Sequence, residues 1–264
     1  MTPELIDTHC HLTFPPLADR VESVLADARR AGVARFITVA CSPGELDAAL
    51  ALARVHEGVW VAAGVHPHEA ARVDDADLER IARAWRDDSL LVAAGEMGLD
   101  YHYDYSPRPC QQRVFARQLE LAADAGLPVV VHCREAHEDA VRILTSCGYA
   151  GRPVVFHCFS GTVEQVAELR AHGWRVSFTG VLTFRNAEQT RRVCAATPLD
   201  AILLETDSPY LSPEPVRMVR PNVPAHLVHI ARFAAELHGV PYERMVRAST
   251  AAAVAFFGLS TGAS

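Results

Sequence analysis

The chain has 264 residues, of which half are hydrophobic, and a formal net charge of −7 at pH 7. This length suits one large α/β domain or two small ones. Proteins that hold a long nucleic acid by its phosphates usually carry a basic excess, so the acidic balance argues against that mode of binding unless bound cations supply positive charge locally. No apolar run approaches the roughly 20 residues that span a bilayer, and the N-terminus does not read as a secretory signal.

Short apolar runs that are typical of strands alternate with helical patterns along the chain. In order, the expected strands cover residues 5–12, 35–41, 59–65, 90–96, 128–133, 153–158, 174–181 and 201–207. Between them, apolar residues recur at spacings of three and four, as in 111–126 and 163–173, and several of these segments end in glycine. That pattern predicts helices with glycine C-caps.

The expected strands are continuous apolar runs, which is typical of parallel strands covered on both faces. Eight such β-α units predict a (β/α)8 barrel, read as a single domain over residues 1–264. The alternative is an open doubly wound sheet, but no GxGxxG motif follows the first strand to support it. A proline-rich stretch at 209–224 predicts a long loop after the eighth strand, and its part 212–224 is a candidate functional segment.

Ionisable residues gather at the carboxyl ends of the expected strands, where barrels of this type carry their chemistry. Those at the strand ends are His9, His11, His66, His68, Glu96, His132, Arg134, His157 and Asp207. A single histidine at a strand end is more often a satisfied polar residue than a ligand, and Glu96 or Asp207 alone could serve in a turn. Their joint placement instead predicts a metal site, because unpaired acids on a buried rim would be costly.

Six of these residues are candidate metal ligands, namely His9, His11, Glu96, His132, His157 and Asp207. Six ligands suit two divalent ions with a carboxylate between them, and Glu96 is the natural bridge because both of its oxygens can bind. The histidine content favours zinc or manganese, while magnesium remains compatible.

The seven cysteines form no CxxC pair, which favours reduced thiols in a cytoplasmic protein. Cys10, Cys133 and Cys158 alternate with the histidines along their strands, so they are expected to point toward the helices rather than to bind metal.

The motifs together resemble one family. "DTHCHL" (7–12), "GVHPH" (64–68), "GEMGLDY" (95–101), "VHCRE" (131–135), "FHCFSG" (156–161), "SFTGVLTFRNA" (177–187) and "LLETDSPYL" (203–211) are similar to the TatD-type metal-dependent hydrolases of the amidohydrolase superfamily. The resemblance implies that His9, His11 and Asp207 bind one metal, that His132 and His157 bind the other, and that Glu96 bridges them. The chain departs from the family pattern at Thr13, where many relatives are acidic, and in "VRPNVPA" (219–225).

The predicted reaction is hydrolysis by metal-activated water, with Asp207 and Glu96 as the catalytic residues and Asp207 as the proton acceptor. By resemblance we expect a deoxyribonuclease of the 3'-5' exonuclease type that acts on a DNA strand end. His66, His68, Arg134 and Arg220 are candidate substrate contacts. The alternatives are hydrolysis of a small ester, lactone or amide, or of an aminoacyl-tRNA ester, and a non-catalytic metal-binding scaffold. No membrane association and no obligate protein partner are expected.

Overall fold

The structure is a computed structural model and describes residues 4–259. Its strands are β1 (Leu5–Cys10), β2 (Val33–Ala40), β3 (Val59–Ala63), β4 (Leu91–Asp100), β5 (Val129–Arg134), β6 (Val154–Phe156), β7 (Arg175–Phe178) and β8 (Ile202–Leu204). Its α-helices are α1 (Val21–Ala31), α2 (Leu46–Val55), α3 (Asp75–Asp87), α4 (Arg108–Ala125), α5 (His137–Ser146), α6 (Val163–Ala171), α7 (Glu188–Ala196), α8 (Leu227–Leu237) and α9 (Tyr242–Phe257). Short 3-10 turns lie at Ala18–Arg20, Pro67–Glu69, Gly180–Thr183, Leu199–Ala201 and Pro224–His226.

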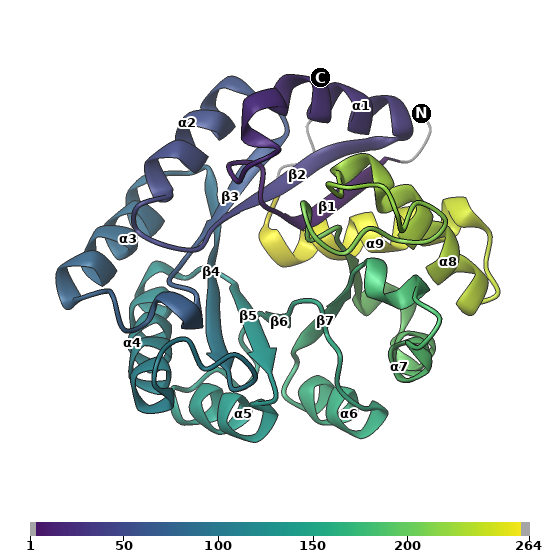
Figure 1. The fold of residues 1–264 in the computed structure, drawn as a ribbon. Helices are drawn as coiled ribbons and strands as arrows, with labels where there is room; N and C mark the ends of the chain where they lie inside the picture. The colour runs from purple at the N-terminus through teal and green to yellow at the C-terminus, as the bar shows by residue number, and fades with distance from the viewer. Residues whose placement is uncertain (1–3, 260–264) are drawn as a thin grey trace. The chain divides into compact units, whose positions relative to one another are not determined.

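The strands form one sheet in the order β1 to β8, and helices alternate with them along the chain (Figure 1). Neighbouring strands pair in parallel wherever their register is defined, as β3 does with β4 and β5 does with β6. This sequential parallel order confirms the predicted (β/α)8 fold class. Within residues 4–259, no helix is both long enough and apolar enough to cross a membrane.

Contacts within the chain divide it into two compact units. Unit 1 contains residues up to 38, 158–166 and those from 176 on, and unit 2 contains 39–157 and 167–175. Each unit is thus assembled from segments that are separated in sequence. The single domain expected over residues 1–264 stays a prediction.

In unit 1, α9 packs against β1 and β8 and also contacts α8. Its buried side is an apolar stripe that includes Met245, Val246, Ala253 and Phe257. These residues recur at helical spacing, so one face of the helix covers the strands.

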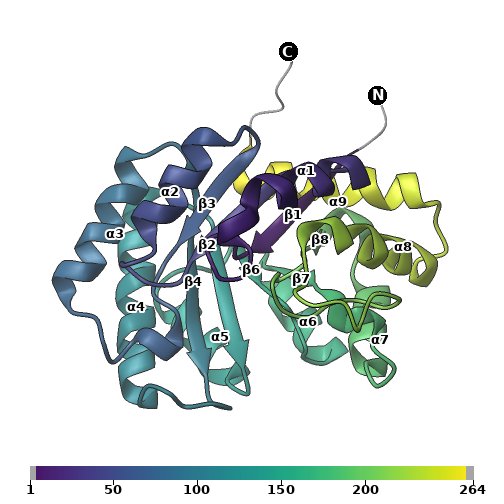
Figure 2. The same ribbon diagram turned by 45° about the horizontal axis from the view of Figure 1, so that its top comes forward.

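In unit 2, α2 packs on β3, and α4 packs on β4 and against α3 (Figure 2). Polar side chains under these helices bind the backbone around the strands. Trp85 of α3 donates its indole N–H to the Ala63 carbonyl at 2.9 Å. Gln118 of α4 accepts the Val65 N–H at 2.7 Å and donates to the Val65 carbonyl at 3.1 Å. The chain that leads from β3 toward His66 is therefore held by α4.

Strand β4 runs to Asp100, four residues beyond its predicted end, because it pairs with β5 along that stretch. Gly98 lies beside His132 in this register and Asp100 lies beside Arg134. Gly98 has a φ of +141°, and a Cβ atom there would overlap the backbone oxygen of His132. Only glycine fits this close approach, which sets the spacing between Glu96 and His132.

Candidate metal centre

Glu96 of β4 is the centre of a histidine cluster in unit 2. Its Oε1 atom lies 2.8 Å from His132 Nδ1 and 2.8 Å from His157 Nε2. The two imidazole nitrogens lie 3.5 Å from each other. Ligand atoms about 2.1 Å from a tetrahedral zinc ion lie roughly 3.4 Å apart. The nitrogen–nitrogen edge of this triangle has that length, whereas the two edges to Glu96 are hydrogen-bond lengths and would lengthen around a bound ion. The donor set of two imidazoles and one carboxylate fits a divalent ion.

The charge state of Glu96 suits this role. Burial alone would raise the pKa of its carboxyl group. The neighbouring histidines His157, His66 and His132 outweigh burial and hold that pKa well below its usual range. Glu96 is therefore an anion at any working pH, as a metal ligand must be.

His132 has a carboxylate at each ring nitrogen. Its Nδ1 atom faces Glu96, and its Nε2 atom lies 3.0 Å from Asp100 Oδ2. A ligand histidine commonly donates its second N–H to a carboxylate, which fixes the tautomer and raises the basicity of the ligating nitrogen. With a metal ion bound at Nδ1, the ring would keep its Nε2 proton in the bond with Asp100, and the Nδ1 lone pair would face the ion.

Asp100 is fully buried, and its backbone is fixed by the side chain of Gln111. The Gln111 amide accepts the Asp100 N–H at 2.8 Å and donates to the Asp100 carbonyl at 3.0 Å. The Asp100 Oδ2 atom also lies 3.0 Å from His68 Nε2. Burial opposes ionisation of the Asp100 carboxyl group. The hydrogen bonds with His132, the Tyr103 N–H and His68 outweigh burial and hold the pKa of Asp100 below its usual value. Asp100 thus orients His132 and His68 together.

We predict that Asp100→Asn weakens binding of divalent metal by about 10- to 100-fold, as expected for loss of a carboxylate that supports a ligand histidine. Calorimetric titration of the metal-stripped protein with Zn²⁺ or Mn²⁺ measures the change. Asp139→Asn is a matched control, since Asp139 accepts from Tyr101, Gln112 and Arg142 and from no imidazole. Equal affinity in both variants would contradict the role of Asp100.

His66 also reaches the cluster, with its Nε2 atom 3.4 Å from Glu96 Oε1. Its Nδ1 atom accepts the backbone N–H of His68 at 3.1 Å. Burial lowers the pKa of His66 to about 4, so the ring is neutral at pH 7 and carries its single proton on Nε2. That proton points toward Glu96. His66 is therefore placed as a donor to a ligand or to a substrate, and less well as a ligand.

Unit 1 contains a second group of predicted ligands, His9 and His11 of the β1 end and Asp207. The Oδ1 atom of Asp207 lies 3.3 Å from His11 Nε2 and 3.9 Å from His9 Nε2. Backbone bonds hold the group together, because Asp207 N–H donates to the His9 carbonyl at 2.9 Å and His11 N–H donates to the Ser208 carbonyl at 2.8 Å. The two histidines thus face the same oxygen of Asp207, and binding of one divalent ion by this set stays a prediction.

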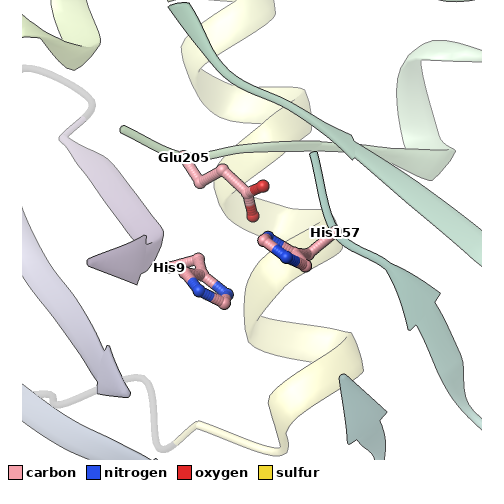
Figure 3. A group of neighbouring side chains, drawn as sticks. All are labelled: His9, His157 and Glu205. Atoms are coloured by element: carbon pink, nitrogen blue, oxygen red, sulfur yellow. The ribbon is translucent and has the colours of Figure 1, made fainter. Parts of the chain in front are cut away.

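Three buried acids beside these groups were missed in the sequence. Asp100 is one, and the other two are Glu205 and Asp7 in unit 1. Glu205 Oε1 accepts the Cys158 N–H at 2.7 Å, and Figure 3 shows its carboxylate and the ring of His9. Asp7 accepts the Thr206 hydroxyl at 2.6 Å, and burial raises its pKa to about 7. The strand period of two, which places Asp7, His9 and His11 on one face, was the available signal for Asp7.

The remaining candidate contacts are exposed. Arg134 lies over the Tyr103 ring, with its guanidinium carbon 4.8 Å from the ring centroid. Arg220 lies in the loop after β8 and is exposed. Asn222 anchors this loop, because its amide donates to the carbonyls of Thr206 at 2.9 Å and Tyr210 at 2.6 Å. The structure brings His66 and His68 to the histidine cluster of unit 2.

All seven cysteines are free thiols. Cys10 Sγ lies 3.5 Å from the Ile37 carbonyl, and Cys158 Sγ lies 3.3 Å from the Thr179 hydroxyl. Burial raises the pKa of Cys133 to about 12, so this residue stays a thiol. Cys41, which the strand pattern did not single out, lies beside Glu96, with Sγ 3.8 Å from Oε2.

We predict that Cys133→Ala and Cys158→Ala keep bound metal and turnover within about twofold of the parent, because each cysteine follows a histidine directly in sequence and is expected to point to the opposite side, toward the helices. The packing cost should be modest, about 1 kcal/mol in the free energy of unfolding. Metal analysis and thermal unfolding of both variants test this. Loss of metal in either would show that the sulfur belongs to the ligand set.

A parallel (β/α)8 sheet with imidazoles and carboxylates converging after its strands defines the class of metal-dependent hydrolases. The family described as TatD related DNase matches residues 6–258. The chain belongs to this TatD family.

Two sequence relatives and one solved structure support the assignment to the TatD family. The chain is 34% identical to an uncharacterized metal-dependent hydrolase, YabD of Bacillus subtilis (strain 168), over 97% of this chain and 100% of the relative. It is 38% identical to the 3'-5' ssDNA/RNA exonuclease TatD of Cronobacter sakazakii (strain ATCC BAA-894), over 89% and 90% of the two chains. The crystal structure of YJJV, a TatD homolog from Escherichia coli K12, superimposes with a TM-score of 0.93 at 32% identity, over 98% of this chain and 100% of the other.

Proposed function

We propose that the protein is a deoxyribonuclease that removes nucleotides from the 3' end of a DNA strand by metal-dependent hydrolysis. The triangle of Glu96 Oε1, His132 Nδ1 and His157 Nε2 carries this proposal, because these residues would supply a metal-ligand set next to polar groups that can meet a substrate. The relative from Cronobacter sakazakii, which is named as a 3'-5' ssDNA/RNA exonuclease, supports the substrate class and the polarity.

Two divalent ions would be held by these residues. His9, His11 and Asp207 would hold one in unit 1, and His132 and His157 would hold the other in unit 2, with Glu96 as the predicted bridge. Such ions, when bound, lower the pKa of water and stabilise negative charge that develops on a phosphate. Imidazole-rich sets favour zinc or manganese, and magnesium is the third candidate.

Further side chains would accept a proton, donate a proton or contact the substrate. The backbone at Asp207 is held in place by two hydrogen bonds. The Asp207 N–H donates to the His9 carbonyl, and the His11 N–H donates to the Ser208 carbonyl. We assign to Asp207 the proton of the attacking water, which a positioned carboxylate can accept. Neutral His66 can donate its Nε2 proton to a substrate oxygen. His68, Arg134 and Arg220 are the proposed contacts for the rest of the substrate, and the free thiols favour a cytoplasmic site of action.

The test is cleavage of end-labelled DNA strands by the purified protein with Mg²⁺, Mn²⁺ or Zn²⁺, before and after chelation. Stepwise shortening from the 3' end with release of mononucleotides is expected. Internal cuts would contradict exonuclease action, and shortening from the 5' end would contradict the polarity. RNA strands and a fully paired duplex in the same series define the range of substrates.

Hydrolysis of a carboxylic ester is the second candidate. The same donor sets polarise a carbonyl oxygen as well as a phosphoryl oxygen. The relative from Bacillus subtilis is named only as a metal-dependent hydrolase, which is compatible with a small ester, lactone or amide, or with an aminoacyl-tRNA ester. A panel of such substrates, assayed with the same metals, favours this candidate if they are cleaved and DNA is not.

A further inference from the structure

Two tyrosines in the turn after β4 form an exposed aromatic stack in unit 2. The rings of Tyr103 and Tyr105 lie 5.3 Å apart with an interplanar angle of 21°. Both are among the large apolar residues that stay exposed, Tyr103 at 46% and Tyr105 at 68%. Large aromatic side chains at the surface are costly to leave in water, so a paired and exposed arrangement points to a ligand surface.

The turn that carries this Tyr103–Tyr105 stack is preformed. The buried Asp100 carboxylate accepts the backbone N–H groups of His102 at 3.0 Å and Tyr103 at 2.9 Å. The hydroxyl of Ser106 donates to the His68 carbonyl at 2.9 Å. Because the backbone is held at both ends of the stack, little conformational entropy is lost when a ligand binds there.

The guanidinium group of Arg134 and the imidazole ring of His68 complete the surface. The Arg134 guanidinium lies over Tyr103, 4.8 Å from its centroid. His68 meets Tyr105 edge-on, with centroids 4.7 Å apart, and meets Tyr103 at 5.7 Å. The nearby acids are already paired, since Asp104 bonds Arg108 at 2.9 Å and Glu135 bonds His102 at 2.7 Å. They therefore present little unpaired negative charge to an anionic ligand.

The ring of His68 lies between the Tyr103–Tyr105 stack and the candidate ligands. The His68 ring lies 4.3 Å from His66 and 6.1 Å from His132, centroid to centroid. Asp100 Oδ2 contacts both His68 and His132 at 3.0 Å. A substrate with one group at Glu96 would thus place the next group of its chain on His68 and the tyrosines.

Aromatic faces joined to an arginine are the usual platform for unstacked nucleobases, because every base has a π-face. A protein with a net charge of −7 cannot rely on long-range attraction of phosphates. Base stacking supplies affinity that does not need a basic surface. It also requires bases that are not already stacked in a duplex.

We propose that the Tyr103–Tyr105 stack, with Arg134, binds the nucleobase of the nucleotide adjacent to the scissile phosphodiester. Stacking on these rings would bind any base through its face, without strong sequence preference. This inference rests on the proposed nuclease function and specifies the substrate of that site.

The test compares Tyr105→Leu with Tyr105→Phe, which keeps the ring and is the matched control. Each variant is assayed on a single-stranded DNA oligomer and on the same oligomer with abasic residues at its last two 3' positions. On the normal strand, Tyr105→Leu should raise KM about tenfold while kcat stays within about twofold, and Tyr105→Phe should match the parent. On the abasic strand, the parent should already show the raised KM, and Tyr105→Leu should add nothing.

Two outcomes overturn the stack while nuclease activity stands. One is an unchanged KM for Tyr105→Leu on the normal strand, and the other is an equal loss on normal and abasic strands at unchanged metal content. A parent protein that cleaves no strand overturns the proposed function instead. Polarisation binding of the same two labelled strands then decides the stack alone, and equal binding by parent and Tyr105→Leu overturns it too.

Discussion

Replacing Asp207 with asparagine should lower turnover by about 10²- to 10⁴-fold, the usual range for loss of a general base. Asparagine keeps the shape and one ligating oxygen, so the contact with His11, now 3.3 Å from Oδ1, can persist. It cannot accept a proton from water at working pH. We expect the metal held by His132 and His157 to remain, and the acidic limb of the pH–rate profile to disappear.

Metal analysis, kcat and the pH–rate profile of Asp207→Asn are measured together on the best substrate. Near-normal turnover with the acidic limb intact would show that the proton goes to another group, and His68 is then the next candidate. Loss of all bound metal would show instead that Asp207 acts mainly as a ligand. The two results separate the proton-accepting role from the metal-binding role.

The fold was predictable because parallel strands buried on both faces leave a simple sequence pattern. The continuous apolar runs at 128–133 and 153–158 correspond to β5 and β6, and the glycine predicted to end a helix at Gly126 has a φ of +69°. Strand ends were less predictable. Strand β8 stops at Leu204, three residues before Asp207, so the ligand lies in the segment after the strand.

Much of the site was also predictable, because parallel strands present their carboxyl ends at one edge. His132 and His157 do converge on Glu96, and His9 and His11 converge on Asp207. Whether they bind metal stays a prediction, since it depends on ions rather than on side-chain placement.

The supporting acids were harder to foresee. Asp100 is four residues from Glu96 on β4, and only the three-dimensional register shows that it meets the far nitrogen of His132. Tyr103 and Tyr105 follow it in a turn, where sequence periodicity carries no information about ring contacts. The hydrogen bond from His68 N–H to His66 Nδ1, which settles the tautomer of His66, is likewise a property of the folded turn.

Replacing Glu96 with glutamine should have the largest effect on metal binding. The substitution keeps the volume but removes the negative charge that His132, His157 and His66 all face at Oε1. A lost supporting carboxylate weakens metal binding about 10- to 100-fold, so loss of the ligand itself should weaken it by at least about 100-fold. Turnover at limiting metal should fall in parallel.

Thermal unfolding gives a readout that does not depend on activity. Free metal at 100 times the parent's Kd stabilises a one-site protein by about 2.7 kcal/mol, and a 100-fold weaker variant gains only about 0.4 kcal/mol under the same conditions. For a chain of this size the parent's gain corresponds to a rise in Tm of about 5–10 °C, and the variant's gain to about 1 °C.

Glu45→Gln is the matched control for this measurement, because Glu45 accepts the Cys41 N–H at 2.8 Å and lies 3.2 Å from the Ser42 hydroxyl, with no imidazole among these partners. We expect Glu45→Gln to keep the full metal-dependent rise in Tm, whatever its own stability. An equal rise in Glu96→Gln would show that the carboxylate charge of Glu96 contributes little to metal binding, and that the histidines hold the ions without it.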